Sequence, residues 1–202
     1  MTPTESAAAK PQLITPTFVL AWVANFCQFL VFYLFVTTMA LYAVESFGAS
    51  DTVGGFASSA FVLGATCMRV FSGWIVDRVG HKKAALTSLA FVTVVAVAYF
   101  FAHNVAVLII VRMVHGAGYA LTSTALMAVA QSVIPHERRA EGTGYFALGT
   151  TLATAFGPAI GLLLANNIGY TTLFAAALGA NIVSLILALV LRYPAEVSSE
   201  KP

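Results

Sequence analysis

The stretch SGWIVDRVGHKK, residues 72–83, places a cluster of charge directly after a long apolar run. Residues 52–76 contain a single charged side chain, Arg69. A run of about 20 predominantly apolar residues is long enough to cross the hydrocarbon core of a bilayer as a helix. The sequence therefore predicts a membrane-spanning helix that ends where the charge begins. The charged residues of the cluster are Asp77, Arg78, Lys82 and Lys83.

The rest of the chain has the composition of a polytopic membrane protein. Of its 202 residues, 59% are hydrophobic and 9% are charged. Soluble domains carry about 25% charged residues, so this chain cannot cover a water-facing surface and must be solvated mainly by lipid. The net charge of +2 says less, because the positions of the charges decide the topology of a membrane protein.

Turn residues and charge clusters divide the apolar sequence into six spans. Unpaired backbone groups in hydrocarbon cost several kcal/mol each, so the spans must be helices. We predict an all-α membrane protein with a tail at 1–16, a six-helix transmembrane bundle at 17–192, and a second tail or the start of a central linker at 193–202. The predicted spans are 17–43, 53–75, 84–102, 105–127, 144–165 and 171–192.

The lysine and arginine residues predict the orientation. Of the ten, Arg69 and Arg112 fall well inside spans, and the other eight fall in the two tails, in the loops after the second and fourth spans and, for Arg192, where the sixth span meets the tail. The loops on the opposite side contain no lysine or arginine, and their charged residues are Glu45 and Asp51. Because positive charge is retained on the cytoplasmic side, we predict a multi-pass protein of the inner (plasma) membrane with both termini in the cytoplasm.

A faint internal similarity links the two halves of the chain. Residues 54–69 in the second span and 143–158 in the fifth both begin with glycine and an aromatic residue and continue through small residues. Three helices followed by three inverted ones are a known transporter arrangement. Chance similarity between two helices rich in glycine and alanine is the alternative.

Three motifs resemble those of the major facilitator superfamily. The stretch after the second span resembles its G-x-x-x-D-R-x-G-[RK]-[RK] signature, with His81 at a position that is usually basic. RMVHGAG resembles the R-x-x-x-G-x-G pattern of the fourth span, and FGPAIG resembles the core of the antiporter motif in the fifth, although Ala153 and Leu162 replace its flanking glycines. The matching residues are Gly73, Asp77, Arg78, Gly80, Lys82, Lys83, Arg112, Gly116, Gly118, Gly157, Pro158 and Gly161.

The resemblance implies a conformational latch at the loop after the second span. Gly73 would let another helix approach, Asp77 would face a helix N-terminus of the opposite half, and Gly80 would form the tight turn. A purely topogenic basic loop is the alternative. PHERRAEGTGYF also resembles the family's loop after the fourth span, where Arg139 would be the charge partner.

Arg112 and His115 are candidates for the coupling site. Inserting an arginine within a membrane-spanning helix costs about 2.5–3.5 kcal/mol of free energy on insertion scales, so Arg112 must face a cavity or a partner. The resemblance implies proton coupling or contact with an anionic group, and the alternative is a structural arginine bound to backbone carbonyls between helices. His115 is either a proton relay or a hydrogen-bonded packing residue. No aspartate or glutamate lies inside the predicted spans, so proton coupling rests on the resemblance alone.

Other side chains are candidates for the substrate pathway. Hydrogen-bonding and aromatic residues share one face of the first span, and they could line a cavity or bond between helices. Arg69 could extend to the cytoplasmic interface or line the inner mouth of the pathway. Gly149, Gly157 and Gly161 would give the fifth helix a smooth stripe, and Pro158 would bend it. The cavity candidates are Asn25, Gln28, Phe29, Phe32 and Tyr33.

Proteins of this superfamily have twelve or more spans in two six-helix halves, whereas this chain has six. It is expected to be an N-terminal half, a truncated product, or a natural half-size protein that pairs with itself or with a second chain. We predict proton-coupled export of a small organic compound; uptake by symport and a non-transporting assembly module are the alternatives. The expected partners are membrane lipid, a small-molecule substrate, protons and a second six-helix half. We expect no enzymatic activity, cofactor, metal or nucleic-acid partner.

Overall fold

The computed structural model describes residues 11–193 and folds them into six long helices. Each is long and apolar enough to cross a membrane, and the described residues include no strand. This confirms the predicted all-α fold with six transmembrane helices. Two short 3₁₀ helices, η1 (Tyr99–Phe101) and η2 (His136–Arg138), lie between them. The long helices are α1 (Pro16–Phe47), α2 (Asp51–Val79), α3 (His81–Ala98), α4 (Val105–Val133), α5 (Arg139–Asn167) and α6 (Tyr170–Val190).

Several helices are longer than the predicted spans. α4 continues from residue 127 to Val133, and α5 begins at Arg139 rather than at residue 144. Hydropathy reports only the part of a helix that lies in lipid, whereas the backbone hydrogen bonds continue into the polar segment. The predicted cytoplasmic tails fall largely on residues 1–10 and 194–202, which lie outside the described residues.

The helix ends are fixed by side-chain caps and by glycine. Thr15, Ser50 and Asn104 precede α1, α2 and α4, and each accepts a hydrogen bond from a backbone N–H in the first turn. These bonds satisfy donors that have no partner within the helix. Gly80 separates α2 from α3 with φ 91°, a conformation that glycine adopts without strain. The tight turn expected at Gly80 is therefore present.

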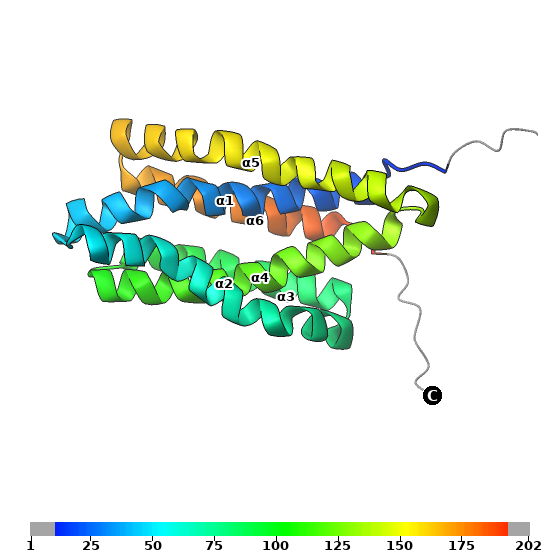
Figure 1. Ribbon diagram of the computed structural model, residues 1–202, viewed down its shortest axis with the longest axis horizontal. Coiled ribbons are helices and arrows are strands. Elements are labelled where there is room, and N and C mark those ends of the chain that lie inside the picture. Colours follow the sequence, from blue (N-terminus) through cyan, green and yellow to red (C-terminus); the bar gives the residue numbers. More distant parts are fainter. Residues whose placement is uncertain (1–10, 194–202) are drawn as a thin grey trace, which may run out of the picture.

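The packing of the helices has an internal symmetry. The most extensive contacts join α2 to α4 and α1 to α5, and the next join α3 to α4 and α1 to α6. If α1, α2 and α3 are exchanged with α4, α5 and α6, the α2–α4 contact becomes the α5–α1 contact. The α3–α4 contact likewise becomes the α6–α1 contact. This pattern supports the predicted inverted repeat. α1 and α4 are therefore the central helices by their contacts, and α2 and α5 are their main partners. Figure 1 shows α5 along one edge of the bundle and α1 beside it.

Glycines permit the two closest helix crossings. A Cβ at Gly64 on α2 would overlap the backbone of Met113, and a Cβ at Gly116 on α4 would overlap the backbone of Phe61. At the equivalent crossing, Gly157 and Gly161 of α5 lie against Tyr33 and Leu34 of α1. Small residues allow backbones to approach closely where lipid provides no hydrophobic driving force. The predicted packing role of the α5 glycines is thus visible in the structure.

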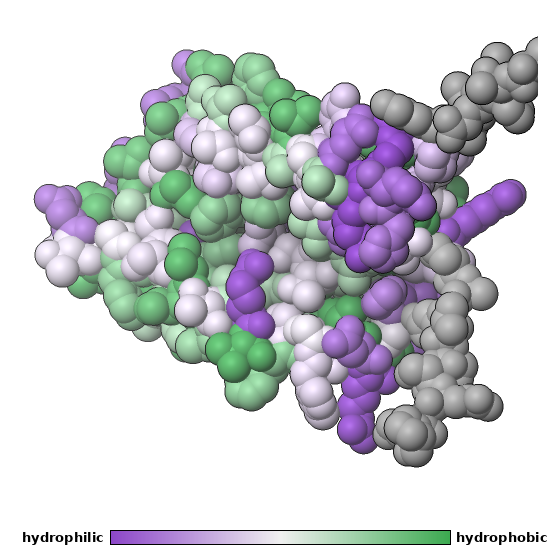
Figure 2. Space-filling model, turned by 45° about the vertical axis from the view of Figure 1, so that its right-hand side comes forward, coloured by the Kyte–Doolittle hydropathy of each residue, from purple (hydrophilic) through white to green (hydrophobic). Residues whose placement is uncertain are grey.

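The outer surface is apolar along the helices and polar at one end. Large hydrophobic side chains such as Val70, Val94 and Leu189 are more than 60% exposed. Figure 2 shows hydrophilic residues gathered at the end of the bundle where, in Figure 1, the α4–α5 connection and the described chain ends lie. A protein with this surface is an integral membrane protein, because water would not solvate its sides.

Candidate functional site

A pocket of about 270 Å³ opens between the central helices and their flanking partners. We call it the inner pocket, because it lies toward the end of the bundle that carries the α4–α5 connection. Side chains from α1, α2, α4 and α5 contribute to its wall, and the wall combines aromatic, hydroxyl and amide groups. The lining residues are Asn25, Phe29, Arg69, Ser123, Thr124, Met127, Phe146, Ala147 and Thr150.

Asn25 and Phe29 are the members of the predicted cavity set that line this pocket. Asn25 is 3% exposed, and its side-chain oxygen accepts no hydrogen bond from any described residue. A buried acceptor without a donor costs about 1–3 kcal/mol. A hydrogen-bond donor that reached the Asn25 oxygen at the pocket wall would therefore remove this free-energy cost.

Gln28 has a different position from its neighbours in the sequence. It is 1% exposed, and its Nε2 donates to Oδ1 of Asn181 on α6 at 3.0 Å. Its role is thus the interhelical hydrogen bond that was the alternative to cavity lining. Asn181 was not singled out from the sequence, although an asparagine in an otherwise apolar span indicates an interhelical partner.

Phe32 and Tyr33 belong to a cluster of packed rings beyond the inner pocket. The Phe32 ring centroid lies 5.0 Å from that of Phe61 and 5.9 Å from that of Tyr119. Tyr33 packs on Phe32 at 4.8 Å and faces Gly157. Both side chains are half-buried, and the Phe32 ring joins α1 to α2 and α4.

Arg69 brings a positive charge to the inner pocket from α2. Its side chain is exposed and lines the pocket, and it forms no ion pair within residues 11–193. Of the two positions predicted for Arg69, the lining of an open pocket is the geometry observed.

Arg112 is fully buried and contacts backbone rather than a cavity. Its Nη2 donates to the oxygen of Ser58 at 2.7 Å and its Nε to the oxygen of Ala57 at 3.3 Å. The guanidinium also lies 5.0 Å from the ring centroid of Phe61, where a π face stabilises a cation. Nη1 has no hydrogen-bond partner in the described residues. Of the two alternatives for Arg112, the observed geometry is that of a structural arginine that bridges α4 and α2 through backbone carbonyls.

His115 lies one turn after Arg112 on α4 and is hydrogen-bonded to Tyr99. Its Nδ1 lies 3.0 Å from the Tyr99 hydroxyl, and the side chains are each 1% exposed. The same ring packs edge-on against Phe61 at 5.4 Å. This is the hydrogen-bonded packing arrangement, and it joins η1 to α4.

The loop motif after α2 includes positions on which no described residue packs. A Cβ at Gly73 would meet no atom within 4 Å, and Asp77 is exposed without an ion pair in the described chain. The basic residues pack on rings: Arg78 lies 5.4 Å from the ring centroid of Trp74, and Lys82 lies 5.7 Å from that of Tyr193. Lys83 is exposed at the start of α3.

Tyr193 is held against the end of α6. Its hydroxyl donates to the oxygen of Ala188 at 3.0 Å. Burial raises the pKa of Tyr193 to about 12, so the hydroxyl remains protonated at neutral pH. Lys82 therefore stacks on a neutral ring.

Arg138, not Arg139, forms the ion pair at the start of α5. Arg138 binds both carboxylate oxygens of Glu141 at 2.9 and 2.7 Å and donates to the oxygen of Pro11 at 2.8 Å. Arg139 is exposed and forms no ion pair in the described residues. Because Glu141 lies three residues after Arg138, the helical register favours Arg138.

α5 remains helical through the antiporter-like motif, with Pro158 inside the helix.

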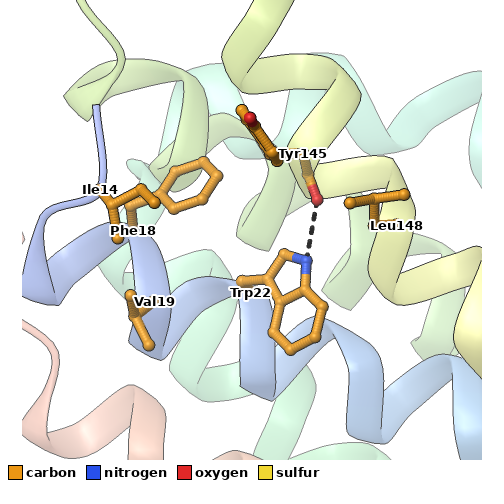
Figure 3. Close-up of a pocket in the computed structure, with 6 residues that line it drawn as sticks. All are labelled: Ile14, Phe18, Val19, Trp22, Tyr145 and Leu148. Carbon is orange, nitrogen blue, oxygen red and sulfur yellow. Dashed lines mark hydrogen bonds between the residues drawn. The ribbon is translucent and has the colours of Figure 1, made fainter.

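Near the start of α5, Trp22 of α1 donates to the oxygen of Tyr145 at 3.0 Å. Figure 3 shows Trp22 beside a second, apolar pocket between α1 and α5, lined also by Phe18 and Leu148. Aromatic side chains with one polar atom are typical of the membrane interface.

Comparison with known proteins agrees with this architecture. The sequence profile of the Major Facilitator Superfamily matches residues 21–202. The multi-drug resistance efflux pump PmrA of Streptococcus pneumoniae is 30% identical over 161 residues, which cover 77% of this chain and 39% of that protein. The staphylopine export protein of Staphylococcus aureus is 31% identical over 123 residues, which cover 60% of this chain and 31% of that protein.

These matches are confined to part of each relative. An uncharacterized MFS-type transporter of Methanocaldococcus jannaschii is 28% identical over 148 residues, or 73% of this chain and 38% of that protein. The chain thus matches less than half the length of these relatives. With a family profile that covers nearly the whole sequence and six membrane-spanning helices that carry its motifs, the chain belongs to the Major Facilitator Superfamily of membrane transporters.

Proposed function

We propose that this six-helix bundle is one half of a proton-coupled exporter of small organic compounds. The observation that carries the proposal is the position of the inner pocket, which is open beside the central helices α1 and α4. A pocket wall that is amphipathic and partly exposed requires a second wall to enclose a substrate. Export is supported by the names of two relatives, an export protein and an efflux pump.

The second wall would be another six-helix bundle, from the same polypeptide or from a second copy. Its docking face would include α2 and α5, where large apolar side chains such as Trp74 and Phe156 are 63% and 56% exposed. Gly73 and Asp77 lie on the same helix as Trp74 and are exposed among the described residues, as a latch to the opposite half would require. The chain ends and the basic loops would face the cytoplasm from the inner membrane.

Proteoliposomes with an imposed pH gradient test the transport proposal. We expect the protein to drive accumulation of at least one compound from a panel of radiolabelled aromatic acids, amines and alcohols, and a protonophore to abolish it. Accumulation equal to that of protein-free liposomes would refute transport, and accumulation indifferent to the protonophore would refute proton coupling. Counterflow from preloaded vesicles would identify the direction.

Native mass spectrometry in detergent tests the need for a second bundle. The 21.2 kDa chain should occur at twice its mass or require a separate six-helix partner for transport. A monomer that transports alone would contradict the two-bundle proposal.

A further inference from the structure

We infer that the inner pocket selects amphiphilic anions that carry an N–H or O–H donor. This inference rests on the proposed function in one respect, namely that the inner pocket is the substrate site. Its support comes from the charge and the hydrogen-bonding state of the side chains that line it.

The charge of the pocket favours an anion. Arg69 is its charged side chain, and no aspartate or glutamate is among the lining residues. Arg69 forms no ion pair in the described part of the chain, so no acidic neighbour neutralises it. Apolar walls lower the local dielectric constant and strengthen the field of a charge. A carboxylate would be attracted and an ammonium group repelled.

Three of the neutral polar side chains that line the pocket offer hydrogen-bond acceptors. The Asn25 side-chain oxygen is buried and lacks a donor. Ser123 and Thr124 line the same pocket, and both hydroxyl hydrogens are already donated to the oxygen of Ala120, at 3.2 and 2.8 Å. In this arrangement each of these two hydroxyl oxygens is free to accept from a ligand. A ligand with an N–H or O–H group would supply the donor that these three oxygens lack.

The remaining wall determines the size and the apolar part of the ligand. Phe29, Met127 and Phe146 contribute aromatic and thioether surface. The volume of about 270 Å³ is close to the lower limit of typical ligand pockets, about 300 Å³. The ligand class that fits is a small aromatic carboxylate with an amide or amine N–H.

Three probes with one benzamide body separate the two requirements. N-benzoylglycine carries the carboxylate and the N–H, its N-methyl analogue lacks the N–H, and N-(2-aminoethyl)benzamide replaces the carboxylate by an ammonium group. Equilibrium binding is measured on the protein in phosphatidylcholine nanodiscs, with empty nanodiscs as the blank. We expect N-benzoylglycine to bind about fivefold more tightly than the ammonium probe, the upper range for an exposed ion pair.

Substitutions assign the preference to the two side chains. Arg69→Gln should abolish the preference for the carboxylate, and Arg69→Glu should reverse it. Arg78→Gln is the matched control, because Arg78 lies on α2 but does not line the pocket. Asn25→Leu should abolish the preference for N–H over N-methyl, and thermal unfolding of each variant verifies that it is folded.

The inference is overturned if the ammonium probe binds as tightly as the carboxylate, if Arg69→Gln leaves the ratio unchanged, or if no probe binds. Binding is measured without a gradient or a partner bundle. Its failure is therefore distinct from the failure of proton-driven transport, which the proteoliposome experiment detects.

Discussion

Gln28 of α1 and Asn181 of α6 form a side-chain hydrogen bond of 3.0 Å in the interior of the bundle. Asn181 in turn donates to the oxygen of Ala177 at 3.1 Å on its own helix, and Ser184 donates to the oxygen of Ala24 on α1 at 2.9 Å. Two polar contacts one turn apart thus fix α6 against α1. In a bilayer, where the apolar surfaces of the helices are equally well solvated by lipid, such contacts specify which faces meet.

A double-mutant cycle measures this bond. Gln28→Leu and Asn181→Leu should each lower the free energy of unfolding, because each leaves one buried polar group unpaired. The two effects should be less than additive, with a coupling of about 0.6–1.7 kcal/mol. Unfolding by SDS in mixed micelles provides the measurement. Strict additivity would show that the two side chains do not interact.

Gly64→Ala should destabilise the bundle by about 1–3 kcal/mol, the usual cost of overpacking. The added Cβ would overlap the backbone of Met113 on α4. Gly55→Ala is the matched control on the same helix, since a Cβ there meets no atom within 4 Å, and it should raise stability by up to about 1 kcal/mol. The same SDS titration compares them. Equal effects at the two positions would contradict the close α2–α4 crossing.

Arg112→Lys should destabilise the protein by about 2 kcal/mol, although the charge is kept. The guanidinium donates from two nitrogens to two successive carbonyl groups of α2, whereas an ammonium group cannot reproduce this fork. Arg78→Lys, at an exposed position, should have almost no effect. Wild-type stability of Arg112→Lys would show that the carbonyl contacts contribute little.

Gly73→Leu should separate folding from transport. The position is exposed and a Cβ meets nothing, so the stability of the bundle should be unchanged within about 0.5 kcal/mol. If a second bundle packs on this face, the bulky side chain should reduce transport in proteoliposomes at least tenfold. Gly55→Leu, also exposed on α2, serves as the comparison. Unchanged transport in Gly73→Leu would argue against contact at this face.

Cysteine accessibility tests the orientation. In a background without the two free cysteines, Cys27 and Cys67, single cysteines replace Lys83 and His103 at opposite ends of α3 and η1. A membrane-impermeant maleimide applied to intact cells should label His103→Cys but not Lys83→Cys. Permeabilisation should expose both. The reverse pattern would invert the proposed topology.

The site was less predictable than the fold. Asn25 and Gln28 are three residues apart on one helix and look alike in the sequence, yet one lines the inner pocket and the other bonds to α6. The difference depends on where α6 lies, which no local pattern encodes. Similarly, Arg69 and Arg112 are both arginines within spans, but the first faces the pocket and the second is buried against carbonyl groups.

The sequence by itself determined the class, the six helices and the gathering of cations at one end, because lipid solvation demands long apolar helices and the spacing of charge along the chain is a local property. It also determined the family, through motifs at fixed positions. Only the tertiary structure decided which polar side chains face a pocket and which bond between helices. That choice follows from the helix crossings that Gly64, Gly116, Gly157 and Gly161 permit, since a rotation of one helix exchanges its buried and open faces.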